Sequence, residues 1–168
     1  MARRTQFALS TLNLYNLNLP GLRMYGDTQG WDEPAYDRKL EWIRRTILQH
    51  PSDVWGVQEL WRHDAIKAVF DHPALTDYAL LVPPGHSGQK IVCAGAVKKD
   101  ILVGEPEWIN RFPDKFRLES QGGDDQTPTV AVRLNGFSRP VLHFKVRPRA
   151  SGPAISVYVA HFKSKRMF

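Results

Sequence analysis

The stretch "DVWGVQEL", residues 53 to 60, is a short apolar run that closes on an amide and a carboxylate, Gln58 and Glu59. Its length and composition predict a buried strand that carries Glu59 out of the core at its C-terminal end. Rigid strand ends are where sites are assembled in α/β proteins. Other strands that end on a polar side chain are therefore candidates for the same site.

Two further apolar runs end in this way. "FALSTLNL", residues 7 to 14, has apolar residues at both parities, which predicts a first strand buried on both faces. Asn13 falls near its end, before the turn-prone "NLNLPG". "ISVYVAHF", residues 155 to 162, alternates as a strand and delivers His161 to its tip.

Two helices are expected between the first strands. Asp32-Glu33-Pro34 is a typical helix start, His50-Pro51 a typical end, and a second helix spans 63–72, where Pro73 stops it. Further strands are expected at 78–83, 91–99, 101–109, 129–134 and 140–146. A βαβα pattern followed by strands predicts an α/β (α+β) chain with mixed or antiparallel sheets. The apolar residues that recur at helical spacing in the first helix are Tyr36, Leu40, Ile43 and Ile47.

Composition indicates an ordinary globular domain. The 168 residues are 42% hydrophobic and 24% charged, with no linker, so we expect one domain over 1–168. Lys and Arg (23) exceed Asp and Glu (17), and the resulting +6 favours a polyanionic substrate or partner, such as nucleic acid. The single Cys93 excludes an internal disulfide, and its apolar run predicts a buried thiol. With no signal peptide and no stretch long enough to span a membrane, a cytoplasmic location is expected.

The three strand-end side chains suit one kind of chemistry. Carboxylate and amide oxygens are hard ligands for Mg²⁺ or Mn²⁺, and an imidazole can move a proton or bind a phosphoryl oxygen. Each residue alone also fits a structural role: Asn13 as a turn residue, Glu59 as a solvated carboxylate at a helix start, His161 as a core histidine. Spacing leaves both interpretations open.

The residue sequences of these three segments give a further indication of function. "STLNLYNL", "DVWGVQEL" and "VYVAHFKSKR", in this order, resemble the endonuclease/exonuclease/phosphatase superfamily, which includes pancreatic deoxyribonuclease, exonuclease III-like repair enzymes, inositol polyphosphate 5-phosphatases and neutral sphingomyelinases. The resemblance implies a deoxyribonuclease I-like four-layer α/β sandwich and a phosphoester hydrolase that uses Mg²⁺, with Mn²⁺ as an alternative.

The same resemblance implies roles for particular residues. Glu59 would bind the metal, and Asn13 would orient the metal site or the phosphate. Gln58 would support Glu59, and His161 would contact the scissile phosphate. Weaker candidates are Asn16 and residues Lys163 to Lys165, with Lys163 as a substrate contact; an exposed structural role fits them equally.

Two later segments of the superfamily, Gly-Asp-x-Asn and Ser-Asp-His, do not follow the His161 strand in this sequence. The loop containing "QGGDDQTP" precedes that strand and is expected to be a turn. Gln89 and Lys90 stand where deoxyribonuclease-like members have a glutamate that pairs with the histidine. We therefore expect an incomplete sandwich, truncated at its C-terminus and inactive by itself.

The competing hypothesis is a non-catalytic module that binds nucleic acid or protein through its basic surface. Nucleic acid, inositol phosphate and phospholipid headgroups all stay open as substrates.

Overall fold

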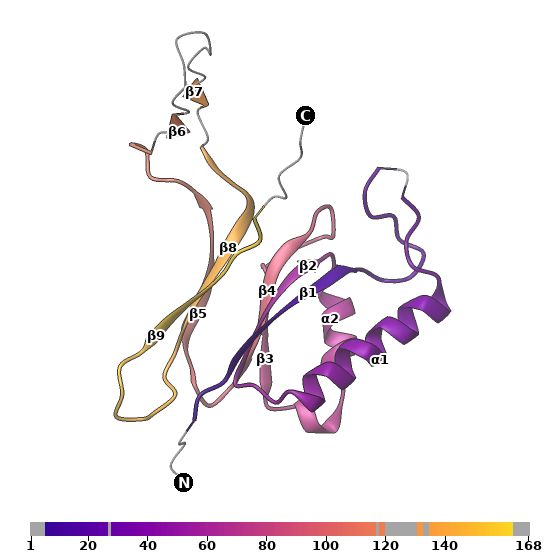
Figure 1. Cartoon of the computed structure of the whole chain (residues 1–168), viewed down its shortest axis with the longest axis horizontal. Coiled ribbons are helices and arrows are strands. Elements are labelled where there is room, and N and C mark those ends of the chain that lie inside the picture. The colour runs from indigo at the N-terminus through magenta and orange to yellow at the C-terminus, as the bar shows by residue number, and fades with distance from the viewer. Residues whose placement is uncertain (1–5, 27, 117, 120–130, 133–134, 163–168) are drawn as a thin grey trace, which may run out of the picture.

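The computed structural model describes residues 6–26, 28–116, 118–119, 131–132 and 135–162 (Figure 1). The chain forms, in order, β1 (Leu9–Leu17), α1 (Glu33–Gln49), β2 (Val54–Leu60), α2 (His63–Phe70), the 3₁₀ turn η1 (Pro73–Leu75), β3 (Tyr78–Leu81), β4 (Val92–Lys98), β5 (Leu102–Arg111), β6 (Leu118–Glu119), β7 (Ala131–Val132), β8 (Gly136–Val146) and β9 (Ile155–Val159).

The strands form two main sheets. The first has the order β1-β2-β4-β3, with β1 and β2 parallel and the other pairs antiparallel. The second has the order β5-β8-β9 and is antiparallel throughout, and β6 pairs with β7 in a small separate ribbon. The predicted α/β class with mixed and antiparallel sheets is confirmed.

The layers follow from this topology. The helices α1 and α2 cover one face of the first sheet, and the second sheet lies against its other face (Figure 1). Within the described residues, no helix covers the outer face of the second sheet. These residues therefore make three layers: helices, mixed sheet, antiparallel sheet.

The helices begin and end close to where local signals put them. Asp32 caps α1 by accepting a hydrogen bond from the Ala35 N–H at 2.7 Å, and Pro34 lies in its first turn. The second helix ends at Phe70 and is shorter than the predicted 63–72, because His72 instead caps the η1 turn through Nδ1. The apolar stripe of α1 is buried as expected: Tyr36, Ile43 and Ile47, with Leu40 partly buried.

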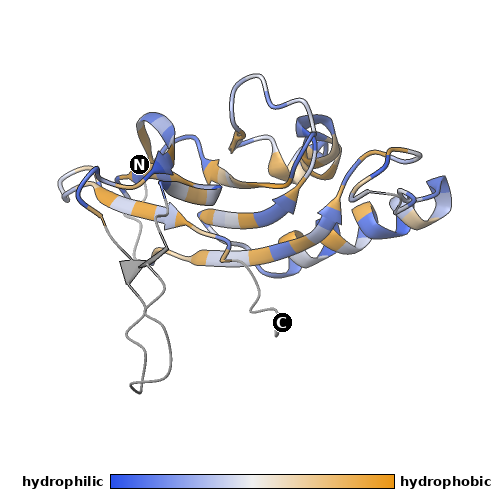
Figure 2. Ribbon diagram, turned by 90° about the horizontal axis from the view of Figure 1, so that it is seen from above, coloured by the Kyte–Doolittle hydropathy of each residue, from blue (hydrophilic) through white to orange (hydrophobic). Residues whose placement is uncertain are grey.

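The strand β2 separates two hydrophobic cores. Trp55 and Val57 face the helices, whereas Val54 belongs to the core between the sheets. Figure 2 shows hydrophobic residues, in orange, recurring along the strands. Gly56 also faces the second sheet, because a Cβ there would lie 2.9 Å from Val159 Cγ2. This close approach sets how β9 lies on β2.

The first strand differs from its prediction. It is not buried on both faces: Leu9 is 52% exposed, and Thr11, Asn13 and Tyr15 alternate as exposed residues. The reason is topological, because β1 is an edge strand of its sheet and packs only one row of side chains on the helix-side core. It also continues to Leu17, past the turn expected after Asn13.

Cys93 is fully buried, as predicted, and burial raises the pKa of its thiol to about 11. A search of the described residues finds no helix with the length and hydropathy needed to cross a membrane.

Candidate functional site

The pairing of β1 with β2 is interrupted by a bulge. The two strands run in register from Leu9 opposite Val54 to Asn13 opposite Gln58, and pairing resumes only at Leu17 opposite Leu60. Three residues inside this interruption have positive φ: Tyr15 (47°), Asn16 (57°) and Glu59 (62°). The left-handed region costs a non-glycine residue on the order of 1–3 kcal/mol, and such strain gathers at functional sites. The bulge therefore marks this end of the sheet as a candidate site.

The bulge changes the direction of the Glu59 side chain. Strict alternation along β2 would put residue 59 with Trp55 and Val57 in the helix-side core, and Leu60 on the opposite face. Instead Leu60 lies in that core and Glu59 is only partly buried, because the extra residues shift the alternation. A carboxylate that would have been buried among hydrophobic side chains is turned toward β1 and β9.

Glu59 is the centre of the contacts at this end of the sheet. Its Oε1 accepts a hydrogen bond from Asn13 Nδ2 at 3.0 Å, and its Oε2 accepts one from the Asn16 backbone N–H at 3.1 Å. His161 Nε2 lies 3.5 Å from Oε1. The three residues singled out from the sequence, each at the end of a different strand, thus lie together.

The amide of Asn13 is oriented by its two partners. Its Oδ1 accepts a hydrogen bond from the Tyr15 N–H at 2.8 Å, while its Nδ2 donates to the carboxylate. A flipped amide would set two oxygens against each other at Glu59 and lose the Tyr15 bond. Asn13 is therefore a positioning residue for Glu59 in this arrangement.

Asn16, a weaker candidate from the sequence, contributes through its backbone. Its side-chain oxygen accepts a hydrogen bond from Trp61 Nε1 at 3.1 Å, and its carbonyl accepts one from Trp31 Nε1 at 2.8 Å. These two indoles hold the left-handed turn in place. Its N–H thereby stays directed at the Glu59 carboxylate.

His161 lies two residues beyond β9, with 17% of its side chain exposed. The pKa of this imidazole is lowered, first by burial and then by the charge of Arg139, and Glu59 opposes the shift. The ring is therefore neutral at neutral pH. Its Nδ1 is buried and has no hydrogen-bond partner among the described residues.

Two cations near Glu59 were not identified from the sequence. The Lys39 ammonium, on α1, lies 4.6 Å from the Trp31 ring centroid and 5.2 Å from that of Tyr15. Burial lowers its pKa, and the charge of Glu59 opposes that shift. Arg139, on β8, donates from its guanidinium to the Phe162 carbonyl at 3.4 Å. No local motif marks either residue, because tertiary packing alone brings α1 and β8 to the site.

The remaining candidates lie elsewhere. Gln58 donates from Nε2 to Thr11 Oγ1 at 3.0 Å, and so ties β2 to β1 just before the bulge. Its support of Glu59 is thus at most indirect, through the register of the two strands. Lys163 lies outside the described residues.

A divalent cation can be considered from the donors present. Each oxygen of Glu59 accepts one hydrogen bond from the chain, which leaves lone pairs for a metal. No group of three or more His, Cys, Asp and Glu side chains suited to a metal occurs in the part of the chain that is described. Mg²⁺ is commonly held by one or two carboxylates together with water and substrate phosphates. Glu59 fits that mode of binding, whereas the donors of the described residues do not form a site in which the protein alone supplies all ligands.

The comparisons with known proteins found a match among solved structures. No protein-family model matches the chain, and no curated protein matches it. Among solved structures it is similar to the crystal structure of an endonuclease/exonuclease/phosphatase family protein from Bacteroides thetaiotaomicron, with 16% sequence identity and a TM-score of 0.46. The match covers 90% of this chain and 49% of that one, so the chain spans about half the length of that protein.

Proposed function

We propose that this chain carries the Glu59 portion of a metal-dependent phosphoester-hydrolysing site. The observation that supports it most is the convergence of Glu59, Asn13 and His161, the residues that the motif resemblance implied, at a strained end of the first sheet. These side chains come from β1, β2 and the segment after β9, far apart in the sequence.

Each residue has a role in this proposal. Glu59 provides the anionic oxygens for Mg²⁺ or Mn²⁺, and the hydrogen bonds from Asn13 and Asn16 hold it in one orientation. When bound, the ion supplies positive charge against the phosphate. His161, neutral at neutral pH, donates a hydrogen bond to a phosphate oxygen or exchanges a proton with the reacting group. Arg139 offsets negative charge on the substrate.

The described residues place no aspartate beside His161 to make a base of it, and the carboxylate that lies beside it is that of Glu59, with Oε1 at 3.5 Å from Nε2. We therefore expect residues 1–168 by themselves to hydrolyse phosphodiesters very slowly. A second candidate function is a nucleic-acid-binding module. It is favoured by exposed aromatic rings beside the site, Tyr15 at 69% and Phe162 at 79%, next to the two cations.

The test compares Glu59→Gln with Glu105→Gln, which neutralises an exposed carboxylate on β5. Electron paramagnetic resonance of Mn²⁺ measures metal binding to residues 1–168, and hydrolysis of bis(p-nitrophenyl) phosphate at high protein concentration measures their slow activity. We expect Glu59→Gln to remove both and Glu105→Gln to keep both. Metal binding and hydrolysis that survive Glu59→Gln would refute the assignment. Oligonucleotide binding that weakens steeply with salt, without any Mn²⁺ site, would favour the binding module.

A further inference from the structure

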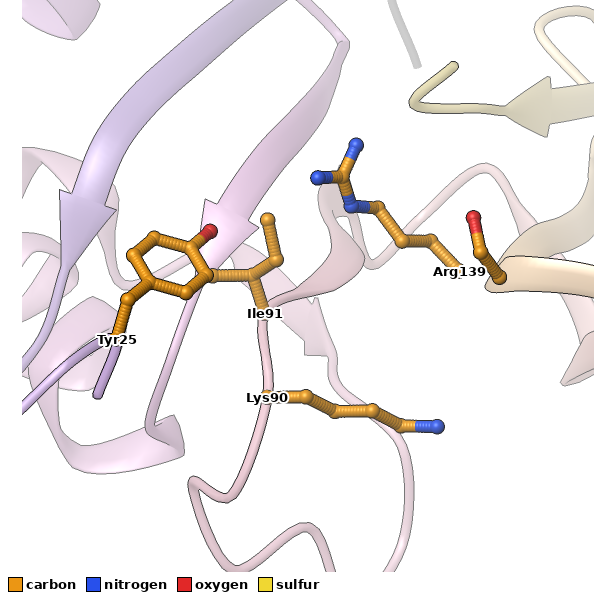
Figure 3. Close-up of a pocket in the computed structure, with 5 residues that line it drawn as sticks. Tyr25, Lys90, Ile91 and Arg139 are labelled. Carbon is orange, nitrogen blue, oxygen red and sulfur yellow. The ribbon is translucent and has the colours of Figure 1, made fainter. Parts of the chain in front are cut away.

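A pocket of about 240 Å³ lies beside the Glu59 site. It is lined by Tyr25 from the loop before α1, by Lys90 and Ile91 just before β4, and by Ser138 and Arg139 of β8. Figure 3 shows Tyr25 and Arg139 extending toward each other from opposite sides, with Ile91 between them and Lys90 on a third side. The volume is below the roughly 300–1,000 Å³ typical of sites for drug-sized ligands, so the pocket suits one functional group.

The charge of the pocket is one-sided. Among the residues that the structure describes, its lining holds two cations, Lys90 and Arg139, and no carboxylate. The charge of Lys90 also reaches His86. The pKa of His86 is lowered mainly by burial and further by the charges of Lys90 and Arg62, whereas hydrogen bonds to the backbone raise it. This end of the molecule therefore presents positive potential around a small hollow.

The donors of the pocket match an oxyanion. The Arg139 guanidinium, the Lys90 ammonium and the hydroxyls of Tyr25 and Ser138 can all donate hydrogen bonds to phosphate oxygens. Ile91, which is 4% exposed, supplies an apolar wall beside these donors.

The pocket and the Glu59 site share two side chains. Burial, and next the charge of Glu59, raise the pKa of Tyr25, while Arg139 opposes that rise. The Tyr25 ring also lies 5.1 Å from that of Trp61, two residues after Glu59. Arg139 donates to the carbonyl of Phe162, next to His161, at 3.4 Å. A ligand in the pocket and a phosphoryl group at Glu59 would therefore be neighbours, close enough to belong to one molecule.

We propose that this pocket is a subsite for a second phosphate of the substrate, next to the one that is hydrolysed. The proposal rests on the proposed function for the reaction itself, and it narrows the substrate class to phosphoesters that carry at least two phosphate groups. In this proposal Arg139 contacts both phosphates, whereas Lys90 and Tyr25 contact only the phosphate in the subsite.

The binding test does not depend on hydrolysis. Inorganic phosphate is titrated into residues 1–168 in the presence of EDTA at low ionic strength, and binding is followed by calorimetry and by tryptophan fluorescence, to which Trp61 contributes with its ring 5.1 Å from that of Tyr25. We expect saturable binding at millimolar phosphate that weakens with added NaCl. Lys90→Gln and Tyr25→Phe should each weaken it by about fivefold, the loss of one exposed charge-assisted hydrogen bond.

Two controls make the result specific. Lys145→Gln removes an equal charge from an exposed position further along β8 and should leave the affinity unchanged. Glu59→Gln removes the carboxylate required for the proposed reaction, and in EDTA it should keep or strengthen phosphate binding. Absence of saturable binding, or an equal loss in Lys90→Gln and Lys145→Gln, would overturn the subsite. A subsite that binds while Glu59→Gln leaves hydrolysis intact would overturn the proposed function only.

Discussion

The contact between Gly56 and Val159 offers the most direct test of how the site is put together. It packs β2 against β9, three residues before Glu59 on one strand and two before His161 on the other. An alanine Cβ at position 56 would lie 2.9 Å from Val159 Cγ2 and 3.3 Å from Cγ1, whereas ordinary contacts begin at 3.4 Å. Gly56→Ala therefore requires Val159 or the sheet that carries it to move away from β2.

The size of the effect follows from this packing. Inserting a methyl group into a filled core costs about 1–3 kcal/mol, and alanine in place of a strand glycine returns about 0.5–1 kcal/mol. We expect Gly56→Ala to lower the free energy of unfolding by about 1–2 kcal/mol. Val159→Ala removes two methyl groups from a side chain that is 5% exposed, at a cost of about 2–3 kcal/mol including the cavity.

The double variant Gly56→Ala/Val159→Ala shows whether the loss of stability in Gly56→Ala comes from its contact with Val159. The methyl group introduced at position 56 would fill space that the Val159 side chain vacates, so Gly56→Ala/Val159→Ala should be about as stable as Val159→Ala alone. The coupling energy would then be about 1–2 kcal/mol. Urea denaturation followed by circular dichroism measures it, and thermal midpoints should fall by about 2–4 °C for each kcal/mol lost.

Gly152→Ala provides the control, because a Cβ there meets only Arg149 at ordinary distances from 3.4 Å. Its effect should add to that of Val159→Ala within about 0.5 kcal/mol. Additivity of Gly56→Ala with Val159→Ala to the same tolerance would refute the sheet-to-sheet contact. It would also remove the basis for placing His161 beside Glu59.

Two other predictions concern the site itself. Tyr15→Val should be less stable than Tyr15→Gly by about 1–2 kcal/mol in chemical denaturation. Both variants lose the ring near Lys39, but only the β-branched valine disfavours the φ of 47° at this position. Equal stabilities would contradict a left-handed backbone at residue 15. The pKa of His161 is below its ordinary value of 6.5 in the folded chain, so the unfolded chain binds more protons as the pH falls through that range. Stability should therefore drop as the pH is lowered through 6.5 toward the lower pKa of the folded state. His161→Gln should remove part of this slope, and an unchanged slope in that variant would show the shift to be absent.

Much of the architecture was predictable from local signals. The helix start at Asp32, the apolar stripe of α1 and the short apolar strands all express periodicity and capping, which act over a few residues. The burial of the first strand was predicted wrongly, because edge or centre is a property of the whole sheet. Apolar residues at both parities do not reveal that β1 has a neighbour on one side only.

The site was predictable in part. Asn13, Glu59 and His161 could be named because each follows an apolar run, and a polar residue there must leave the core. The bulge could not be inferred, since Tyr15 and Glu59 have no intrinsic preference for positive φ. The backbone contact of Asn16 and the positions of Lys39, Tyr25 and Arg139 depend on that bulge and on the packing of the two sheets.

Local sequence thus determined which strands form, where the helices begin, and which polar side chains stand at strand ends, because these depend on neighbours in the chain. Tertiary packing determined where those side chains meet. The shifted register turns Glu59 away from the helix-side core, Gly56 lets β9 approach so that His161 reaches it, and β8 adds Arg139 to form the cationic pocket. Each of these steps joins residues far apart in the chain, as Asn13 and Glu59 are (46 positions), and no short pattern can encode such a contact.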